Sequence, residues 1–113
     1  MKRFKLKDCC IFLYENDLPD SLKFGDKVSI DTETTGLSLV RDRLCLVQIG
    51  TTEKECHIVK FPPSFFKNNS KPKNLINLLA DEKIEKIFHY ARFDIAMISK
   101  FLKVECKKVF CTK

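Results

Sequence analysis

The first half of the chain contains four short segments with the length and apolar content of β-strands, separated by turn-forming residues. They cover residues 10–14, 27–32, 43–50 and 56–60. The next stretch, 61–73, holds three of the four prolines and a polar run, which is typical of a loop. We therefore expect a group of hairpin-linked strands followed by a long connection.

The second half of the chain changes to the period of an α-helix. Apolar residues between 75 and 79 have helical spacing, and Asn74 before them is a candidate N-cap. A second helix is predicted over residues 91–102, and short strands over 84–88 and 108–111. The order β-β-β-β-α-β-α-β requires parallel pairing between strands that a helix joins. The pattern therefore predicts a mixed α/β sheet.

The length and composition are those of one folded domain. A chain of 113 residues, of which 44% are hydrophobic and 32% charged, can bury a core but is too short for two domains. No apolar run approaches the roughly 20 residues that cross a bilayer, and none has the form of a signal peptide. The six cysteines include no Cys-x-x-Cys pair, so we expect thiols in core positions rather than disulfides or a zinc site. These features predict a cytoplasmic protein without a membrane contact.

The charge favours a polyanionic partner such as nucleic acid, because 21 basic and 15 acidic residues leave a net charge of +6. Lys67, Lys71 and Lys73 follow Phe65 and Phe66 in the proline-rich stretch. They could form a basic, aromatic surface for single strands, but a solvated loop with inward phenylalanines is the more common arrangement. Other basic residues are first interpreted as solubilising charge, namely Lys100, Lys103, Lys107 and Lys108.

Two acids flank Thr32 in the second predicted strand. Because side chains alternate along a strand, Asp31 and Glu33 point to the same face. Neighbouring carboxylates repel each other and are costly to desolvate unless a divalent cation lies between them. The alternative is a solvated strand end, which on spacing alone is the more common case.

Two further polar residues stand in apolar surroundings. Gln48 interrupts an apolar strand, and it either faces Asp31 and Glu33 or bonds to nearby backbone. Asp94 lies on the apolar face of the second predicted helix, where an inward acid requires a cation or a hydrogen-bond donor. Its alternative role is that of a first-turn carboxylate favoured by the helix dipole.

Together these segments resemble the DEDD family of 3′–5′ exonucleases, and within it the ribonuclease D-like group. Residues 31–33, Asp-Thr-Glu, are similar to the first exonuclease motif, and residues 88–98 are similar to the second, whose aspartate corresponds to Asp94. The strand at 44–50 resembles the one that follows the first motif. The resemblance extends from about Tyr14 to the end of the chain.

The resemblance implies a ribonuclease H-like α/β fold, a mixed sheet with flanking helices. It also implies metal-dependent hydrolysis of terminal phosphodiesters of RNA or single-stranded nucleic acid to nucleoside monophosphates. Asp31, Glu33 and Asp94 would be the catalytic acids and would hold two divalent cations, Mg²⁺ or Mn²⁺. The residues expected to bind substrate are Thr34, Gln48, His89 and Phe93. For His89 a turn histidine is an equal alternative, and His57 is expected to be structural.

The third family motif, Tyr-x-x-x-Asp or His-x-x-x-Asp, does not follow Asp94, and Glu105 is the only acid there. We therefore expect residues 1–113 to form a single partial exonuclease domain, truncated at its carboxy-terminal side. An apolar patch at Val109, Phe110 and the second predicted helix would then need a carboxy-terminal partner half or self-association to cover it. The alternatives are a non-catalytic nucleic-acid-binding remnant or one half of a split nuclease.

Overall fold

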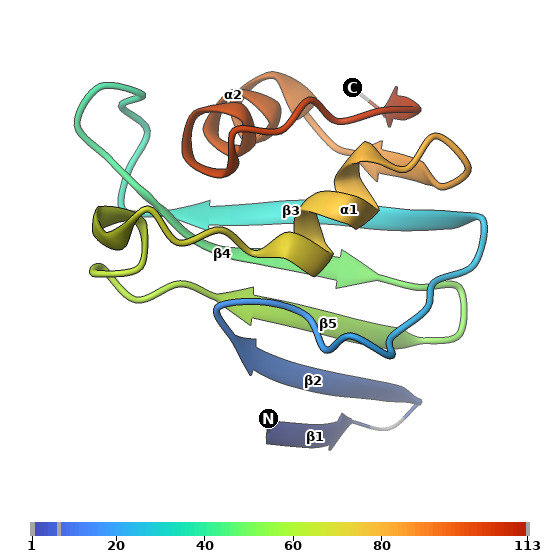
Figure 1. Ribbon diagram of the computed structural model, residues 1–113. Helices are drawn as coiled ribbons and strands as arrows, with labels where there is room; N and C mark the ends of the chain where they lie inside the picture. Colours follow the sequence, from blue (N-terminus) through green and yellow to red (C-terminus); the bar gives the residue numbers. More distant parts are fainter. Residues whose placement is uncertain (1, 7, 113) are drawn as a thin grey trace.

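Seven strands and two α-helices make up the computed structural model, which describes residues 2–6 and 8–112 (Figure 1). The strands are β1 (Lys2–Leu6), β2 (Cys9–Glu15), β3 (Lys27–Thr34), β4 (Leu44–Gly50), β5 (Glu55–Lys60), β6 (Glu85–Phe88) and β7 (Val109–Cys111). The helices are α1 (Lys73–Ala80) and α2 (Ala91–Leu102), and a short 3₁₀ helix, η1, covers Phe66–Asn68.

The strands lie in one mixed sheet in the order β1-β2-β5-β4-β3-β6-β7. Inside it, β3 is antiparallel to β4 and parallel to β6, and β6 is parallel to β7. α1 carries the chain from β5 past β4 and β3 to β6. α2 connects β6 with its parallel neighbour β7, because parallel neighbours need such a crossover. The predicted mixed α/β sheet is confirmed, and so is the parallel pairing of β6 with β7 across α2. The expected pairing across α1 was wrong, because β4 and β3 lie between β5 and β6, and the expected hairpin link of β2 to β3 was wrong, because β2 pairs with β1 and, in parallel, with β5.

The sequence pattern did not predict β1. This strand forms a hairpin with β2, pairing from Lys2 opposite Leu13 to Leu6 opposite Cys9. Three of its five residues are basic, so it lacks the apolar alternation of a core strand. Charged side chains on an edge strand oppose pairing with other chains, which is the physical use of such a composition.

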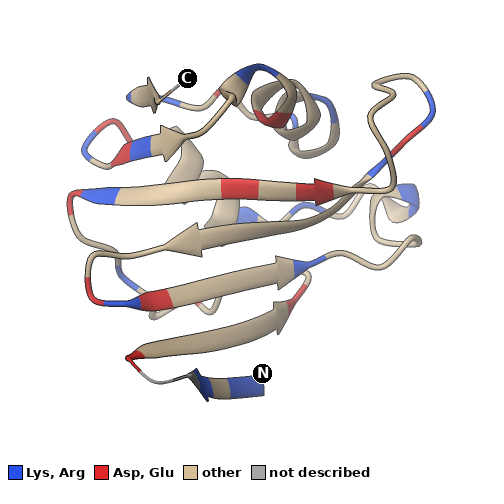
Figure 2. Cartoon of the chain, turned by 180° about the vertical axis from the view of Figure 1, so that it is seen from behind, with Lys and Arg blue, Asp and Glu red and all other residues tan. Residues whose placement is uncertain are grey.

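The core lies between the helices and one face of the sheet. In Figure 1, α1 crosses in front of the strands, and Figure 2 shows the sheet from behind. On the helix side the central strands bury Ile30, Val47 and Val59, and the helices contribute buried residues such as Leu79 and Met97. The burial of these apolar side chains between the helices and this face of the sheet stabilises the fold through the hydrophobic effect.

The other face of the sheet is not covered by a helix within the described residues, and we call it the open face. A row across it is formed by residues that pair in register on β3, β4, β5 and β2, namely Asp31, Gln48, Ile58 and Leu13. Asp31 is exposed and the other three are half-buried. Antiparallel strands such as β3, β4 and β5 commonly leave one face of a sheet open to solvent, as they do here.

The expected apolar patch is only partly present. Val109 and Phe110 of β7 are 39% and 54% exposed. The expectation was wrong for the helix, because α2 packs its apolar side onto the sheet and buries Met97 completely. Phe93 and Phe101 are half-buried. The exposed apolar surface that remains belongs to β7 and, more strongly, to the segment after β3, where Leu37 is 86% and Val40 92% exposed.

His57 is a core residue, as expected. It is 2% exposed, and its ring stacks on Phe12 with a centroid distance of 4.9 Å. Its Nδ1 lies 2.9 Å from the Tyr14 hydroxyl, and its Nε2 lies 3.2 Å from a Glu55 carboxylate oxygen. Burial, with the Glu55 charge adding to it, raises the pKa of the Tyr14 hydroxyl, which therefore remains a neutral phenol.

The cysteines follow the expectation in part. Free thiols are carried by Cys9, Cys10, Cys45, Cys56 and Cys106. Cys111 was expected in the core but is exposed, because β7 is an edge strand. No helix within residues 2–6 and 8–112 has the length and hydropathy needed to cross a membrane.

α1 is capped from a distant part of the chain. The Asp17 carboxylate accepts hydrogen bonds from the backbone N–H groups of Asn74, at 2.8 Å, and Leu75, at 2.9 Å. Pro72 occupies the cap position and makes no side-chain cap bond. Asp17 therefore supplies the negative charge and the acceptors that a helix N-terminus requires.

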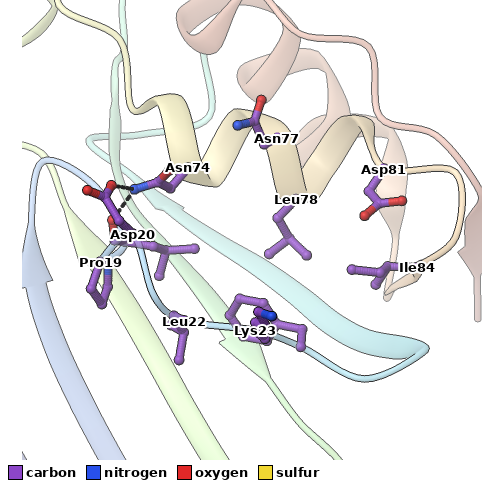
Figure 3. A pocket seen from close by; sticks show the side chains of 11 residues that line it. Pro19, Asp20, Leu22, Lys23, Asn74, Asn77, Leu78, Asp81 and Ile84 are labelled. Carbon is purple, nitrogen blue, oxygen red and sulfur yellow. Dashed lines mark hydrogen bonds between the residues drawn. The ribbon is translucent and has the colours of Figure 1, made fainter.

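The prediction that Asn74 is the N-cap was wrong, because this residue lies within the first turn of α1. Its side-chain amide donates to the Leu18 carbonyl at 2.8 Å and to the Asp20 carboxylate at 2.7 Å (Figure 3). A cavity of about 410 Å³ opens beside this junction, between α1 and the connection from β2 to β3. The amide thus joins α1 to that connection.

We predict that Asp17→Ala lowers the free energy of unfolding by about 1–3 kcal/mol, because two helix N–H groups lose a charged acceptor. Urea denaturation measures the change. Asp20→Ala is the matched control, since Asp20 is exposed and bonds to an amide side chain, and its effect should stay within about 0.5 kcal/mol. Equal stability of the Asp17 variant and the wild type would contradict the role of this cap.

Candidate active site

Two carboxylates project from the same face of β3. Asp31 and Glu33 are exposed, whereas Ile30 and Thr32 are buried, so the strand alternates as predicted. The acidic residues of β3 appear in red in Figure 2. Because they lie on the open face, both acids reach solvent.

Asp31 lines a shallow cavity of about 320 Å³ on the open face. Gln48 pairs with Asp31 on the neighbouring strand and lines the same cavity, so its side chain faces Asp31. His89, which follows β6, also lines it. The structure thus brings together an acid, an amide and an imidazole that lie far apart in the sequence.

His89 is anchored where β6 meets β7. Its Nδ1 lies 2.9 Å from the Thr112 hydroxyl, and its ring packs edge-to-face on Tyr90 with a centroid distance of 4.4 Å. The residue is therefore a turn histidine that also borders the cavity. The sequence offered a turn histidine and a substrate-binding histidine as alternatives for His89. The position in the structure is compatible with both.

Asp94 contacts the residue that separates the two acids. The Thr32 hydroxyl donates a hydrogen bond of 2.5 Å to Asp94 Oδ1, and both side chains are buried. Burial raises the pKa of the Asp94 carboxyl, and the charges of Asp31 and Glu33 raise it further, whereas the Thr32 hydrogen bond lowers it. Asp94 therefore lies within electrostatic range of both acids, although it meets β3 from the helix side.

The start of α2 delivers Asp94 to this position. Tyr90 precedes the helix with φ 55° and ψ 59°, a left-handed conformation that is costly for a residue with a Cβ. The next residue, Ala91, donates its N–H to Cys111 Sγ at 3.3 Å, which ties the turn to β7. Asp94 then falls in the first helical turn, where the helix dipole favours a carboxylate.

The donor set suits a hard divalent cation by its chemistry. Carboxylate oxygens are the ligands that Mg²⁺ and Mn²⁺ prefer, and a cation would relieve the repulsion among the three acids. However, no three Asp, Glu, His or Cys side chains stand close enough to share an ion within the part of the chain that the structure describes.

Two residues that were expected to bind substrate make structural contacts. The Thr34 hydroxyl donates to the Gly36 carbonyl at 2.6 Å, just where the register between β3 and β4 shifts. Phe93 is half-buried and packs against the core. Neither residue lines the cavity that contains Asp31.

Asp42 organises the segment after β3 and was not anticipated from the sequence. Its carboxylate accepts hydrogen bonds from the Ser38 N–H, at 2.8 Å, and the Thr35 hydroxyl, at 3.2 Å. The pKa of Asp42 lies below its usual value. The hydrogen bond from the Ser38 N–H is the largest cause, and the Thr35 hydroxyl and the nearby Arg41 lower the pKa further. A Cβ on Gly36 would lie 2.4 Å from Asp42 Oδ2, so glycine is needed there. No strand or helix period marks such a residue.

The chain matches the family model of the 3′–5′ exonuclease over residues 5–113. Among curated proteins there is no match.

Solved structures share the fold of this chain. NrnC from Brucella melitensis aligns with a TM-score of 0.79 and 41% identity over 91% of this chain and 49% of its own. The exonuclease domain of EXD2 aligns with a TM-score of 0.62 and 21% identity over 76% of this chain and 43% of that one. The catalytic core of RRP6 from Trypanosoma brucei, with a TM-score of 0.61 and 22% identity, covers 77% and 23%. The latter two show a common fold.

The chain thus spans about half the length of NrnC. The matched region begins before β1 ends, includes β3 with its two acids, and extends through α2 with Asp94. On this match and on the identity with NrnC, the chain belongs to the 3′–5′ exonuclease family.

Proposed function

We propose that this domain acts in the metal-dependent removal of nucleoside monophosphates from the 3′ end of RNA or single-stranded nucleic acid. The observation that carries the proposal is the arrangement of three acids around β3. Asp31 and Glu33 lie on its open face, and Asp94 lies within their electrostatic range. Such mutual repulsion costs stability, and perturbed carboxylates of this kind cluster at functional sites.

Asp31, Glu33 and Asp94 would hold two divalent ions, Mg²⁺ or Mn²⁺. Ions bound there would activate water and stabilise the leaving 3′-oxygen of the terminal phosphodiester. Gln48 and His89 would bind the terminal nucleotide in the cavity beside Asp31, through an amide and an imidazole that can hydrogen-bond to sugar or base. Thr34 and Phe93 do not line this cavity. They would support the site from its edge through the contacts of Thr34 with Gly36 and of Phe93 with the core.

Solved structures of NrnC support the classes of ligand. One contains bound Mg²⁺ and another is bound to pGG, and both are 41% identical to this chain. We infer that the cavity beside Asp31 takes the end of a nucleotide chain. We further propose a cytoplasmic location, since free thiols such as Cys9 and Cys56 are typical of a reducing compartment.

A nucleic-acid-binding module without cleavage is the second candidate. It is favoured by the position of Asp94, which bonds to Thr32 rather than sharing a shell with the other acids. The net charge of +6 would then be the main source of affinity. Such a module would bind single strands with a steep salt dependence and would show no metal-dependent hydrolysis.

We also propose that the open face is completed by a further polypeptide, either a carboxy-terminal half or a second copy of the chain. Half-buried apolar residues such as Leu13 and Ile58 lie on this face in the same row as Asp31, on the strands beyond β4. The same polypeptide could bring a fourth acid to the metal site. NrnC, which is about twice as long as this chain, is consistent with such a completion.

The first prediction is that the chain releases labelled monophosphate from a 3′-labelled single strand when Mg²⁺ or Mn²⁺ is present and not in EDTA. Asp31→Ala should reduce the rate at least about 100-fold, because even outer-shell partners of metals contribute about 10–100-fold. Asp26→Ala is the control, since this exposed acid lies outside the cavity. Label loss that persists in Asp31→Ala would identify a contaminating nuclease and remove the enzymatic proposal.

The second prediction concerns the stability cost of Asp94. Its pKa is raised in the folded state, so between the unfolded and folded pKa values the native chain binds more protons than the unfolded chain. The stability contribution of this group is therefore lost as the pH rises through the folded pKa.

We expect Asp94→Asn to unfold at higher urea concentration than the wild type at neutral pH, with a difference that shrinks toward acidic pH. Asn keeps an oxygen for the Thr32 hydroxyl, so the hydrogen bond is preserved. Asp31→Asn, at an exposed position, is the comparison and should change the stability less. A difference that does not vary with pH would contradict the electrostatic account of Asp94.

The third prediction concerns the open face. Without a covering polypeptide, the isolated chain should self-associate in sedimentation velocity, because apolar sheet surface remains in water. Ile58→Glu should shift the distribution toward monomer, whereas Lys60→Glu, on an exposed position of the same strand, should do so less. A wild-type monomer that melts sharply above about 60 °C, as an intact small domain does, would show that no completion is needed.

A further inference from the structure

A second cavity, of about 640 Å³, lies between η1 and the carboxy-terminal end of α2. Its lining combines three lysines, Lys71, Lys100 and Lys103, with two aromatic rings, Phe66 and Phe101. Its lining includes no acidic residue, although the chain has 15 acids. We call this cavity the basic groove.

The aromatic rings form a supported floor. Phe66 and Phe101 lie with a centroid distance of 5.2 Å and an interplanar angle of 56°. Phe66 also packs on the buried ring of Phe61 at 5.2 Å, which anchors the floor to the core. Phe66 and Phe101 are half-buried and both line the groove, and the Lys100 ammonium lies 5.2 Å from the centroid of the Phe101 ring.

The groove is connected to the segment that follows the acidic strand. The Lys100 ammonium donates a hydrogen bond to the Leu39 carbonyl, within the segment that Asp42 organises. Figure 1 shows η1 and this segment at the end of the molecule toward which β3 runs. The groove therefore lies near the end of the molecule toward which β3 runs, and it shares no lining residue with the cavity beside Asp31.

The helix dipole of α2 explains why two of the three lysines of the groove lie where they do. Lys100 and Lys103 belong to the last turn of α2 and its C-cap, where cations are favoured. It does not account for Lys71, which comes from the loop before α1 and faces the same cavity. Three like charges around one apolar floor repel one another, and an anion with a flat apolar part would relieve that repulsion.

We propose that the basic groove binds the phosphodiester backbone of a single-stranded nucleic acid upstream of its 3′-terminal nucleotide, with bases resting on Phe66 and Phe101. Cationic grooves with aromatic floors are the arrangement by which proteins bind single strands without reading their sequence. The assignment extends the proposed exonuclease function, because it identifies where the rest of the substrate strand lies. Lys71 and Lys103 contact phosphates, and Lys100 positions the segment after β3.

The experiment measures binding of a 5′-fluorescein RNA of about ten nucleotides by fluorescence anisotropy in EDTA, so that no cleavage is needed. Lys71→Ala combined with Lys103→Ala should weaken binding about tenfold or more at 0.1 M salt. It should also reduce the slope of log K against log salt by about 1.4, since each single-strand phosphate contact contributes about 0.7. Phe101→Leu should weaken binding several-fold with an unchanged slope, because it removes a stacking surface and no charge.

Lys23→Ala combined with Lys83→Ala is the matched control, because both residues are exposed lysines outside the groove and the change in net charge is the same. Its slope should equal that of the wild type. Equal losses in the two double variants would mean that net charge alone sets the affinity, and the groove assignment would be wrong. Thermal melting of every variant verifies that each remains folded.

The same variants separate the groove from the proposed catalytic function. Groove-dependent binding by a chain that does not hydrolyse RNA in Mg²⁺ or Mn²⁺ would contradict the exonuclease proposal and support the groove. Hydrolysis that depends on Asp31, with RNA binding that is insensitive to Lys71 and Lys103, would contradict the groove and support the exonuclease.

Discussion

The alternation of side chains along β3 is the constraint on which the rest of the structure depends. β3 pairs on both sides, with β4 and β6, and one of its faces must bury Ile30 and Thr32 under the helices. The same two-residue period then places Asp31 and Glu33 on the open face. A slip of one residue would bury both carboxylates and expose the apolar side chains, so the core itself selects the orientation of the acids.

The Thr32–Asp94 hydrogen bond links this strand to α2 and joins folding to function. It satisfies a buried carboxylate with a single donor, while burial and two neighbouring negative charges oppose its ionisation. The left-handed turn at Tyr90 is a further local cost, and it directs the first turn of α2 toward β3. Costs of this kind are tolerated where a fold must hold charges together for binding.

Charge is divided between two parts of the surface. Acids gather on the open face around β3, whereas Lys71 and Lys103 line a groove between η1 and α2. Divalent ions are attracted by the first kind of surface and phosphates by the second. The segment organised by Asp42 follows β3 in the chain and contacts Lys100 of the groove through the Leu39 carbonyl.

The sequence by itself determined the elements whose signal is local. The bounds of α2 follow from the spacing of its apolar residues, and the shared face of Asp31 and Glu33 follows from strand geometry. Only the tertiary structure decided the cap that Asp17 supplies to α1, in place of the predicted Asn74, and the bond between Thr32 and Asp94 across 62 residues. The reason is physical: periodicity reports which side of an element is buried, whereas contacts between distant residues depend on strand order and helix placement, which no local pattern encodes.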